Sequence, residues 1–198
     1  MSIPRTSASI IRSIRQISLY RDWVTIRGQH NLPSLADFKP SERADDASEI
    51  SVNEVVHQDS RIRYRVHEAG QFIETATGES IVGKFLDEFL DPGVIEAAHA
   101  SWDKAVIEQL PVYIIIGMRD ANGIPVTMEH LHLPLSKHHD TSDFLASSMH
   151  IFSDHGRYQH AGLFLSENNH KLKRRDYIID PDIAFDVQIA SELDIEFV

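Results

Sequence analysis

Three segments with the character of β-strands follow one another in the middle of this chain. Residues 112–119 form a continuous apolar run, and residues 120–123 follow with an Asn-Gly pair, a strong signal for a tight hairpin turn. Residues 126–135 supply the return strand, and residues 144–152 supply the next strand after a polar loop. Short connections between consecutive strands require antiparallel pairing. This part of the chain therefore predicts an antiparallel sheet.

Two further strands and three helical segments precede that run. Apolar residues favour a strand over 50–56, and residues 61–66 alternate strictly between polar and apolar, as in a strand with one wet face. Short helices are expected over 69–77 and 83–90, and a long helix over 94–110 ends before a proline. Strands, then helices, then strands that complete the sheet indicate an α+β domain.

The first part of the chain predicts a helix over residues 7–27 that ends at Gly28. Its apolar residues recur at spacings of three and four and define one stripe: Ile10, Ile14, Ile17, Tyr20 and Val24. The stripe is suited either to a dimer contact or to packing on the same chain. Its arginines also suit an anionic membrane surface, and packing is the favoured interpretation. Prolines and acidic residues over 29–49 indicate a linker.

Charge and composition exclude several classes of protein. The chain has 198 residues, a formal net charge of -11 and no cysteine. The missing cysteines remove disulfides, thiolate metal sites, thiol nucleophiles and a cysteinyl flavin adduct. The negative charge disfavours binding to nucleic acid. Because no signal peptide and no membrane-spanning run is visible, we expect a cytoplasmic protein.

Several local sequences resemble those of PAS domains. Residues 77–92 (TGESIVGKFLDEFLDP) are similar to the PAS stretch in which Gly-Lys leads into a short helix. Residues 119–123 (RDANG) stand where PAS domains place the hairpin between their third and fourth strands. Residues 133–135 (LPL) close the fourth strand as in that family.

The flanking residues resemble one branch, the short stand-alone bacterial PAS proteins with a preceding helix. In that branch a helix bearing tyrosine and tryptophan leads into an Arg-Gly turn, a proline and an Asp-x-x-Pro sequence. The matching residues here are Tyr20-Arg-Asp-Trp23, Arg27-Gly28, Leu32-Pro33, Asp37-Phe-Lys-Pro40 and, in the second strand, Tyr64-Arg-Val66.

The resemblance implies a five-stranded antiparallel sheet in the order 2-1-5-4-3, with helices on one face and an N-terminal helix before it. It divides the chain into an N-terminal helix and linker (1–49), a PAS-like sensor domain (50–155) and a C-terminal extension (156–198). It also implies a sensory or regulatory protein that binds a small molecule or a protein partner and signals in trans without an output domain of its own. We expect a homodimer and no enzyme activity.

The histidines define the alternative function. In that interpretation the chain is a metal- or haem-binding protein, and enzyme activity is one of the options. His130 and His132 are two residues apart on a predicted strand, so their side chains leave the same face. Two imidazoles need a third converging ligand to bind a metal, and no acidic residue follows at a suitable spacing. His99 lies in the long helix that carries the haem ligand in haem-binding PAS sensors.

The expected pocket lies between the sheet and the helices, and the sequence identifies no cofactor for it. Its candidate lining residues are mainly aromatic: Tyr64, Phe72, Phe85, Phe89, His99, Trp102, Tyr113, His130 and His132. Such a pocket suits an organic ligand with an apolar body and one polar end. The competing interpretation is a filled core and a scaffold without a ligand.

The last part of the chain matches no known pattern. Residues 171–175 form a basic cluster, which we interpret as an internal charge pair or a solvated turn. From residue 180 to residue 198, acidic residues alternate with apolar ones at the period of a strand. A docked strand and a disordered acidic end remain open for this tail.

Overall fold

A computed structural model describes residues 3–42, 47–59, 61–90, 92–161, 163 and 173–185. The strands are β1 (Arg5–Thr6), β2 (Ile50–Gln58), β3 (Arg61–Ala69), β4 (Val112–Arg119), β5 (Pro125–Leu135), β6 (Phe144–Phe152) and β7 (Lys173–Ile179). The α-helices are α1 (Ile14–Arg27), α2 (Leu35–Phe38), α3 (Gln71–Thr77) and α4 (Pro92–Glu108). Short 3-10 turns are η1 (Ala8–Ile10), η2 (Pro40–Glu42), η3 (Ala47–Glu49) and η4 (Leu86–Glu88).

All seven strands form one sheet in the order β1-β7-β4-β5-β6-β2-β3. The α+β class is confirmed. The sheet has more strands than the five predicted, because β7 and β1 extend it beyond β4. The five predicted strands keep their predicted neighbours within it. β1 runs parallel to β7, so the sheet is not wholly antiparallel.

β7 arises from the segment in which the sequence indicated only a basic cluster. Its charged side chains alternate with less exposed ones, and it pairs with β4 from Lys173 opposite Gly117 to Ile178 opposite Val112. Arg174 donates to the Asp176 carboxylate at 2.6 and 2.9 Å, which agrees with the predicted internal charge pair. The alternating tail is described only as far as residue 185, and its remainder lies outside the described residues.

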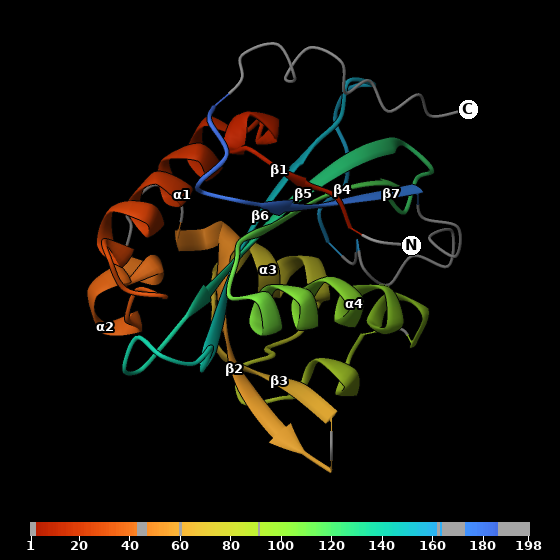
Figure 1. Cartoon of the computed structure of the whole chain (residues 1–198). Coiled ribbons are helices and arrows are strands. Elements are labelled where there is room, and N and C mark those ends of the chain that lie inside the picture. The colour runs from red at the N-terminus through yellow and green to blue at the C-terminus, as the bar shows by residue number, and fades with distance from the viewer. Residues whose placement is uncertain are drawn as a thin grey trace.

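Helices cover both faces of the sheet rather than one (Figure 1). One core contains residues of α1, η1 and the sheet face that includes Val52, Tyr113 and Leu131. The other contains residues of α3, η4, α4 and the opposite sheet face. The expectation of helices on one face therefore holds for α3, η4 and α4, and the N-terminal helix adds a second layer on the other side.

The N-terminal helix is shorter than predicted, and all of its predicted stripe except Ile14 packs on the core. Ser13 accepts a hydrogen bond from the Gln16 amide and caps the start of α1, and Gly28 caps its end as expected. Ile14 is 84% exposed, although the predicted stripe included it. Tyr20 of the predicted stripe is buried, and Gln16, Leu19 and Trp23 are buried beside it. α1 thus packs on its own sheet, the second of the two interpretations left open by the sequence.

The hairpin between β4 and β5 is organised by one buried carboxylate. Asp120 accepts hydrogen bonds from the backbone amides of Asn122, Ile124 and Gln159, at 2.8–2.9 Å. Gly123 adopts a φ of 78°, which glycine reaches without strain. The Asn-Gly signal is confirmed, and Asp120 also ties the loop after β6 to this turn.

No helix in the described ranges is long and apolar enough to cross a membrane.

Candidate ligand-binding site

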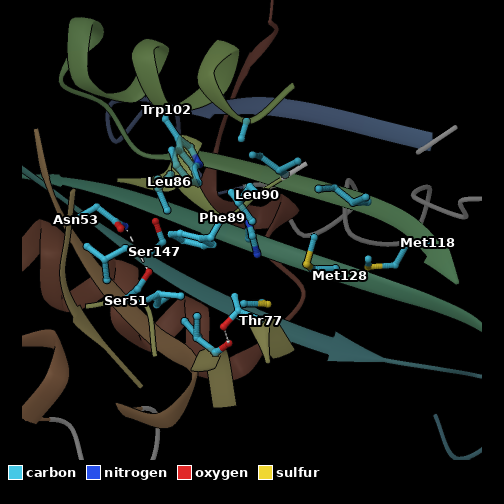
Figure 2. A pocket seen from close by; sticks show the side chains of 18 of the residues that line it. Ser51, Asn53, Thr77, Leu86, Phe89, Leu90, Trp102, Met118, Met128 and Ser147 are labelled. Atoms are coloured by element: carbon cyan, nitrogen blue, oxygen red, sulfur yellow. Dashed lines mark hydrogen bonds between the residues drawn. The ribbon is translucent and has the colours of Figure 1, made fainter. Parts of the chain in front are cut away.

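A cavity of about 110 Å³ lies between the sheet and the layer formed by α3, η4 and α4 (Figure 2). Most of its lining is apolar. The lining residues are Ser51, Asn53, Val66, Ile73, Thr77, Ile81, Leu86, Phe89, Leu90, Ala98, Trp102, Ile114, Ile116, Met118, Met128, His130, Ser147, Met149 and Arg174. An engineered apolar cavity of about 150 Å³ binds benzene, so this space suits the body of a small organic molecule.

The register of the strands makes one end of the cavity polar. Ser51, Ser147 and His132 stand opposite one another across β2, β6 and β5. Side chains two residues further along each strand share the same face, so Met149 and His130 form the next row. Figure 2 shows Ser51, Asn53 and Ser147 together at one end, with Met118 and Met128 at the other. The alternation of side chains along the strands thus builds an amphipathic cavity.

His132 joins helix α4 to the sheet through a directed pair of hydrogen bonds. The Trp102 indole N–H donates to His132 Nε2 at 2.9 Å, and His132 Nδ1 lies 2.8 Å from Ser147 Oγ. Because an indole nitrogen can only donate, Nε2 must accept and the ring proton must stand on Nδ1. Nδ1–H then donates to Ser147. Burial, together with His130 and Arg174, holds the pKa of His132 well below 6.5, in agreement with this neutral ring.

His130 lines the cavity as a second neutral imidazole. Its ring meets that of His132 edge to face, with 5.3 Å between the ring centroids. Burial lowers the pKa of His130 to about 4, and the Arg174 guanidinium contributes. Its Nε2 atom is buried and has no hydrogen-bond partner among the described residues. A buried polar atom of this kind costs free energy until something binds it.

The structure brings six of the nine predicted site residues to the cavity or directly behind it. Phe89, Trp102 and His130 line the space. His132 lies behind Trp102, and Tyr64 packs on Trp102 with 5.2 Å between the ring centroids. His99 contacts Tyr64 from the helix side, and Tyr64 donates to the Asp103 carboxylate at 2.7 Å.

Three predicted site residues lie elsewhere. Tyr113 faces the opposite side of the sheet, where its hydroxyl accepts a hydrogen bond from the Arg12 amide, because odd-numbered residues of β4 face away from the cavity. Phe72 packs edge to face on His160. Phe85 lies beneath the Arg63 guanidinium, 3.7 Å from its ring centroid. The prediction that these three line the pocket is wrong in this structure.

Sequence reasoning missed the polar lining residues Ser51, Asn53, Thr77, Ser147 and Arg174. Ser51 and Asn53 alternate with the buried Val52, so the period of a strand could have assigned them to one face. Arg174 could not have been found in this way, because its strand was not predicted.

The histidines do not offer an arrangement suited to metal or haem. Both ring nitrogens of His132 are hydrogen-bonded within the protein. His99 lies behind Tyr64 and does not line the cavity. No three His, Cys, Asp or Glu side chains gather into a possible metal site within the described part of the chain.

Comparison with known proteins identifies the family of this chain. A family model described as PAS domain matches residues 11–149. The chain therefore belongs to the PAS domain family, as the sequence resemblance predicted, and this membership indicates a sensory, ligand-binding regulatory role. The narrower resemblance to the stand-alone bacterial branch stays a prediction.

Two solved structures show weaker similarity, and a search of curated proteins finds no match. One is a light-oxygen-voltage domain studied with a flavin analogue, at 14% identity and a TM-score of 0.39, covering 59% of this chain and 84% of that one. The other is a variant of RsLOV, at 19% identity and a TM-score of 0.41, covering 61% of this chain and 70% of that one.

Proposed function

We propose that this protein is a PAS-type sensory or regulatory protein that binds a small molecule in the cavity between the sheet and α3, η4 and α4. The observation that carries the proposal is an apolar cavity whose lining residues include two buried polar atoms without a hydrogen-bond partner among the residues that the structure describes, Asn53 Oδ1 and His130 Nε2. Buried polar atoms are normally satisfied, so a ligand that binds them would stabilise the fold.

The signal is proposed to travel through α4. This helix contributes Ala98 and Trp102 to the cavity, and the Trp102–His132 hydrogen bond links it to the centre of the sheet. A ligand that contacts Trp102 and the sheet together changes how α4 sits on β5. The outer face of α4, which carries the exposed Ile107, is then available to report that change to a partner in trans.

The wider proposal keeps the expectations drawn from the family resemblance. The protein acts without catalysis, as a homodimer in the bacterial cytoplasm. Its partner is a signalling protein rather than nucleic acid, in line with a net charge of -11.

Native mass spectrometry of freshly purified protein tests the proposal. We expect a mass excess over the chain mass that disappears on denaturation. Ala98→Phe places a ring in the cavity and should abolish the excess. Ala100→Phe is the matched control, because Ala100 is exposed on the same helix, and it should retain the excess.

The same experiment can reject the proposal. A wild-type mass equal to the chain mass, together with an Ala98→Phe variant clearly less stable than Ala100→Phe, would show that the space holds no ligand and has no room for a ring. The scaffold interpretation would then replace the sensory one.

A further inference from the structure

We propose that the ligand is a small uncharged molecule with an apolar body of about one ring and one head group that both donates and accepts a hydrogen bond. A hydroxyl or an amide N–H with its carbonyl has this chemistry. The head donates to Asn53 Oδ1 and accepts from the Ser147 hydroxyl. This inference rests on the proposed function and adds the class of ligand.

Asn53 supplies the acceptor. Its Nδ2 atom lies 3.3 Å from the backbone carbonyl oxygen of Leu145 and 3.4 Å from Ser51 Oγ. A carbonyl oxygen can only accept, so the amide nitrogen must face it and the orientation of the amide group is determined. Oδ1 then points away from both partners. It is buried, without a hydrogen-bond partner in the described ranges, and a ligand must offer it a donor.

Ser147 supplies the donor. Trp102 obliges His132 Nε2 to accept, so His132 carries its proton on Nδ1 and donates it to Ser147 Oγ. Since that oxygen accepts from histidine, its own hydroxyl proton is directed elsewhere. Ser147 lines the cavity on β6, the strand that pairs with β2 beside Asn53. The two residues thus present one donor and one acceptor at the same end of the cavity.

The remaining lining determines the body of the ligand. Away from the polar end, Met118 and Met128 stand in the cavity (Figure 2), and most of the remaining lining is aliphatic. Methionine side chains are flexible and adapt to a ligand's shape. A cavity of about 110 Å³ beside such side chains accommodates a body of about one ring.

Charge on the ligand is disfavoured. Arg174 is the cationic side chain in the lining, and its guanidinium already binds the Asp176 carboxylate and Ser101 Oγ. An anion would therefore lose its hydration shell on entering the cavity, and the guanidinium that could compensate for this loss is already bound to Asp176. A cation would lie among apolar side chains with no carboxylate in the lining.

A pair of molecules of equal size tests the head group. Phenol and toluene each have one ring and one substituent, but only phenol can donate and accept. Their dissociation constants are measured by NMR titration on protein dialysed until its native mass equals the chain mass. We expect phenol to bind the wild type at least as tightly as toluene, although toluene leaves water more readily.

The Asn53→Leu variant should shift the ratio of the two affinities toward toluene by about tenfold, the size expected for loss of a buried hydrogen bond. Asn31→Leu changes an exposed asparagine in the same way and should leave the ratio unchanged. Ser147→Ala removes the donor instead, and should shift the ratio in the same direction even if Asn53→Leu fails to fold.

Each other outcome overturns the inference. An unchanged ratio in Asn53→Leu and Ser147→Ala, with both probes bound, would reject the head group and leave the cavity's proposed function intact. Tighter binding of benzoate than of phenol would reject an uncharged ligand. If no probe binds, the ligand class is wrong, and the mass excess in native mass spectrometry still decides the proposed function independently.

Discussion

At the scale of single residues, Glu129 is the titratable group with the most unusual position. It follows Met128 on β5 and faces away from the cavity, into the core beneath α1, where its side chain is fully buried. Neither carboxylate oxygen meets hydrogen-bond geometry with a described residue. Burial raises the pKa of the Glu129 carboxyl above 4.5, and the nearby Tyr113 hydroxyl and Arg12 guanidinium offset part of that effect.

Glu129→Gln is expected to change how stability depends on pH. A carboxyl whose pKa is raised by folding stabilises the protein below its unfolded pKa of 4.5 and loses that contribution as the pH rises through its folded pKa. Glutamine does not titrate, so the variant should gain stability over the wild type as pH increases above 4.5. Urea unfolding of both proteins from pH 4.5 to pH 8 measures this difference. A difference that stays constant over that range would contradict it.

Some residues of the candidate site could be predicted from the sequence and others could not, depending on the pattern around each of them. Trp102 and Phe89 were predicted because they are aromatic residues on elements that would surround the pocket of a PAS domain. His130 and His132 were predicted because a spacing of two places both on one face of a strand. Asn53 and Ser147 were missed, since small polar residues in strands usually face solvent, and only the observed layers show that these do not.

At the scale of elements, the strands with short connections were the most predictable. β4 and β6 have the predicted bounds, because a long apolar run between turn signals leaves few alternatives. β7 could not be predicted, since its charged residues acquire a strand conformation by pairing with β4 and carry little apolar pattern of their own. α1 was predicted too long, because the Ser13 cap and the buried Gln16 outweigh the isoleucine spacing.

Gln16 shows how a polar residue can hold a helix on a sheet. Its amide nitrogen donates to the backbone carbonyl oxygens of Glu129 on β5 and Ser148 on β6, both at 3.0 Å. Hydropathy patterns treat such a residue as solvent-facing, and this is why the sequence analysis did not place Gln16 on the buried side of α1.

The β4–β5 hairpin depends on Asp120. Asp120→Ala removes the acceptor of three backbone N–H groups, and we expect it to lower the free energy of unfolding by about 2–3 kcal/mol. Asp154→Ala, at an exposed position in the loop after β6, serves as the control and should change stability by less than about 0.5 kcal/mol. Urea unfolding measures both. Equal stability of the two variants would show that water replaces the carboxylate without cost.

At the scale of the whole molecule, the sheet separates two hydrophobic cores, one on each of its faces. α1 and the N-terminal segment cover one face, and the layer formed by α3, η4 and α4 covers the other (Figure 1). The Trp23 indole is fully buried in the first core and donates to the Pro134 carbonyl oxygen at 2.8 Å. The N-terminal helix is therefore a structural part of the folded domain.

Two substitutions on α1 test this integration. Trp23→Ala should lower the free energy of unfolding by about 3–5 kcal/mol, because it leaves a large cavity in the core. Ile14→Ala, at the 84% exposed position, should change stability by less than about 0.5 kcal/mol. Thermal and urea unfolding measure both variants. A small effect of Trp23→Ala would mean that α1 docks only weakly on the sheet.

The pairing of β7 with β4 also has a consequence for biosynthesis. Until residues 173–179 leave the ribosome, the apolar strand β4 has no neighbour on one side, and the same holds for every refolding attempt in which β7 lags. Unpaired apolar edges are templates for aggregation, and contacts between distant residues form late. The charged strand β7 therefore protects the edge of β4 from aggregation only after it has been synthesised and has paired. The interval before that pairing is the period in which the nascent protein most needs a chaperone.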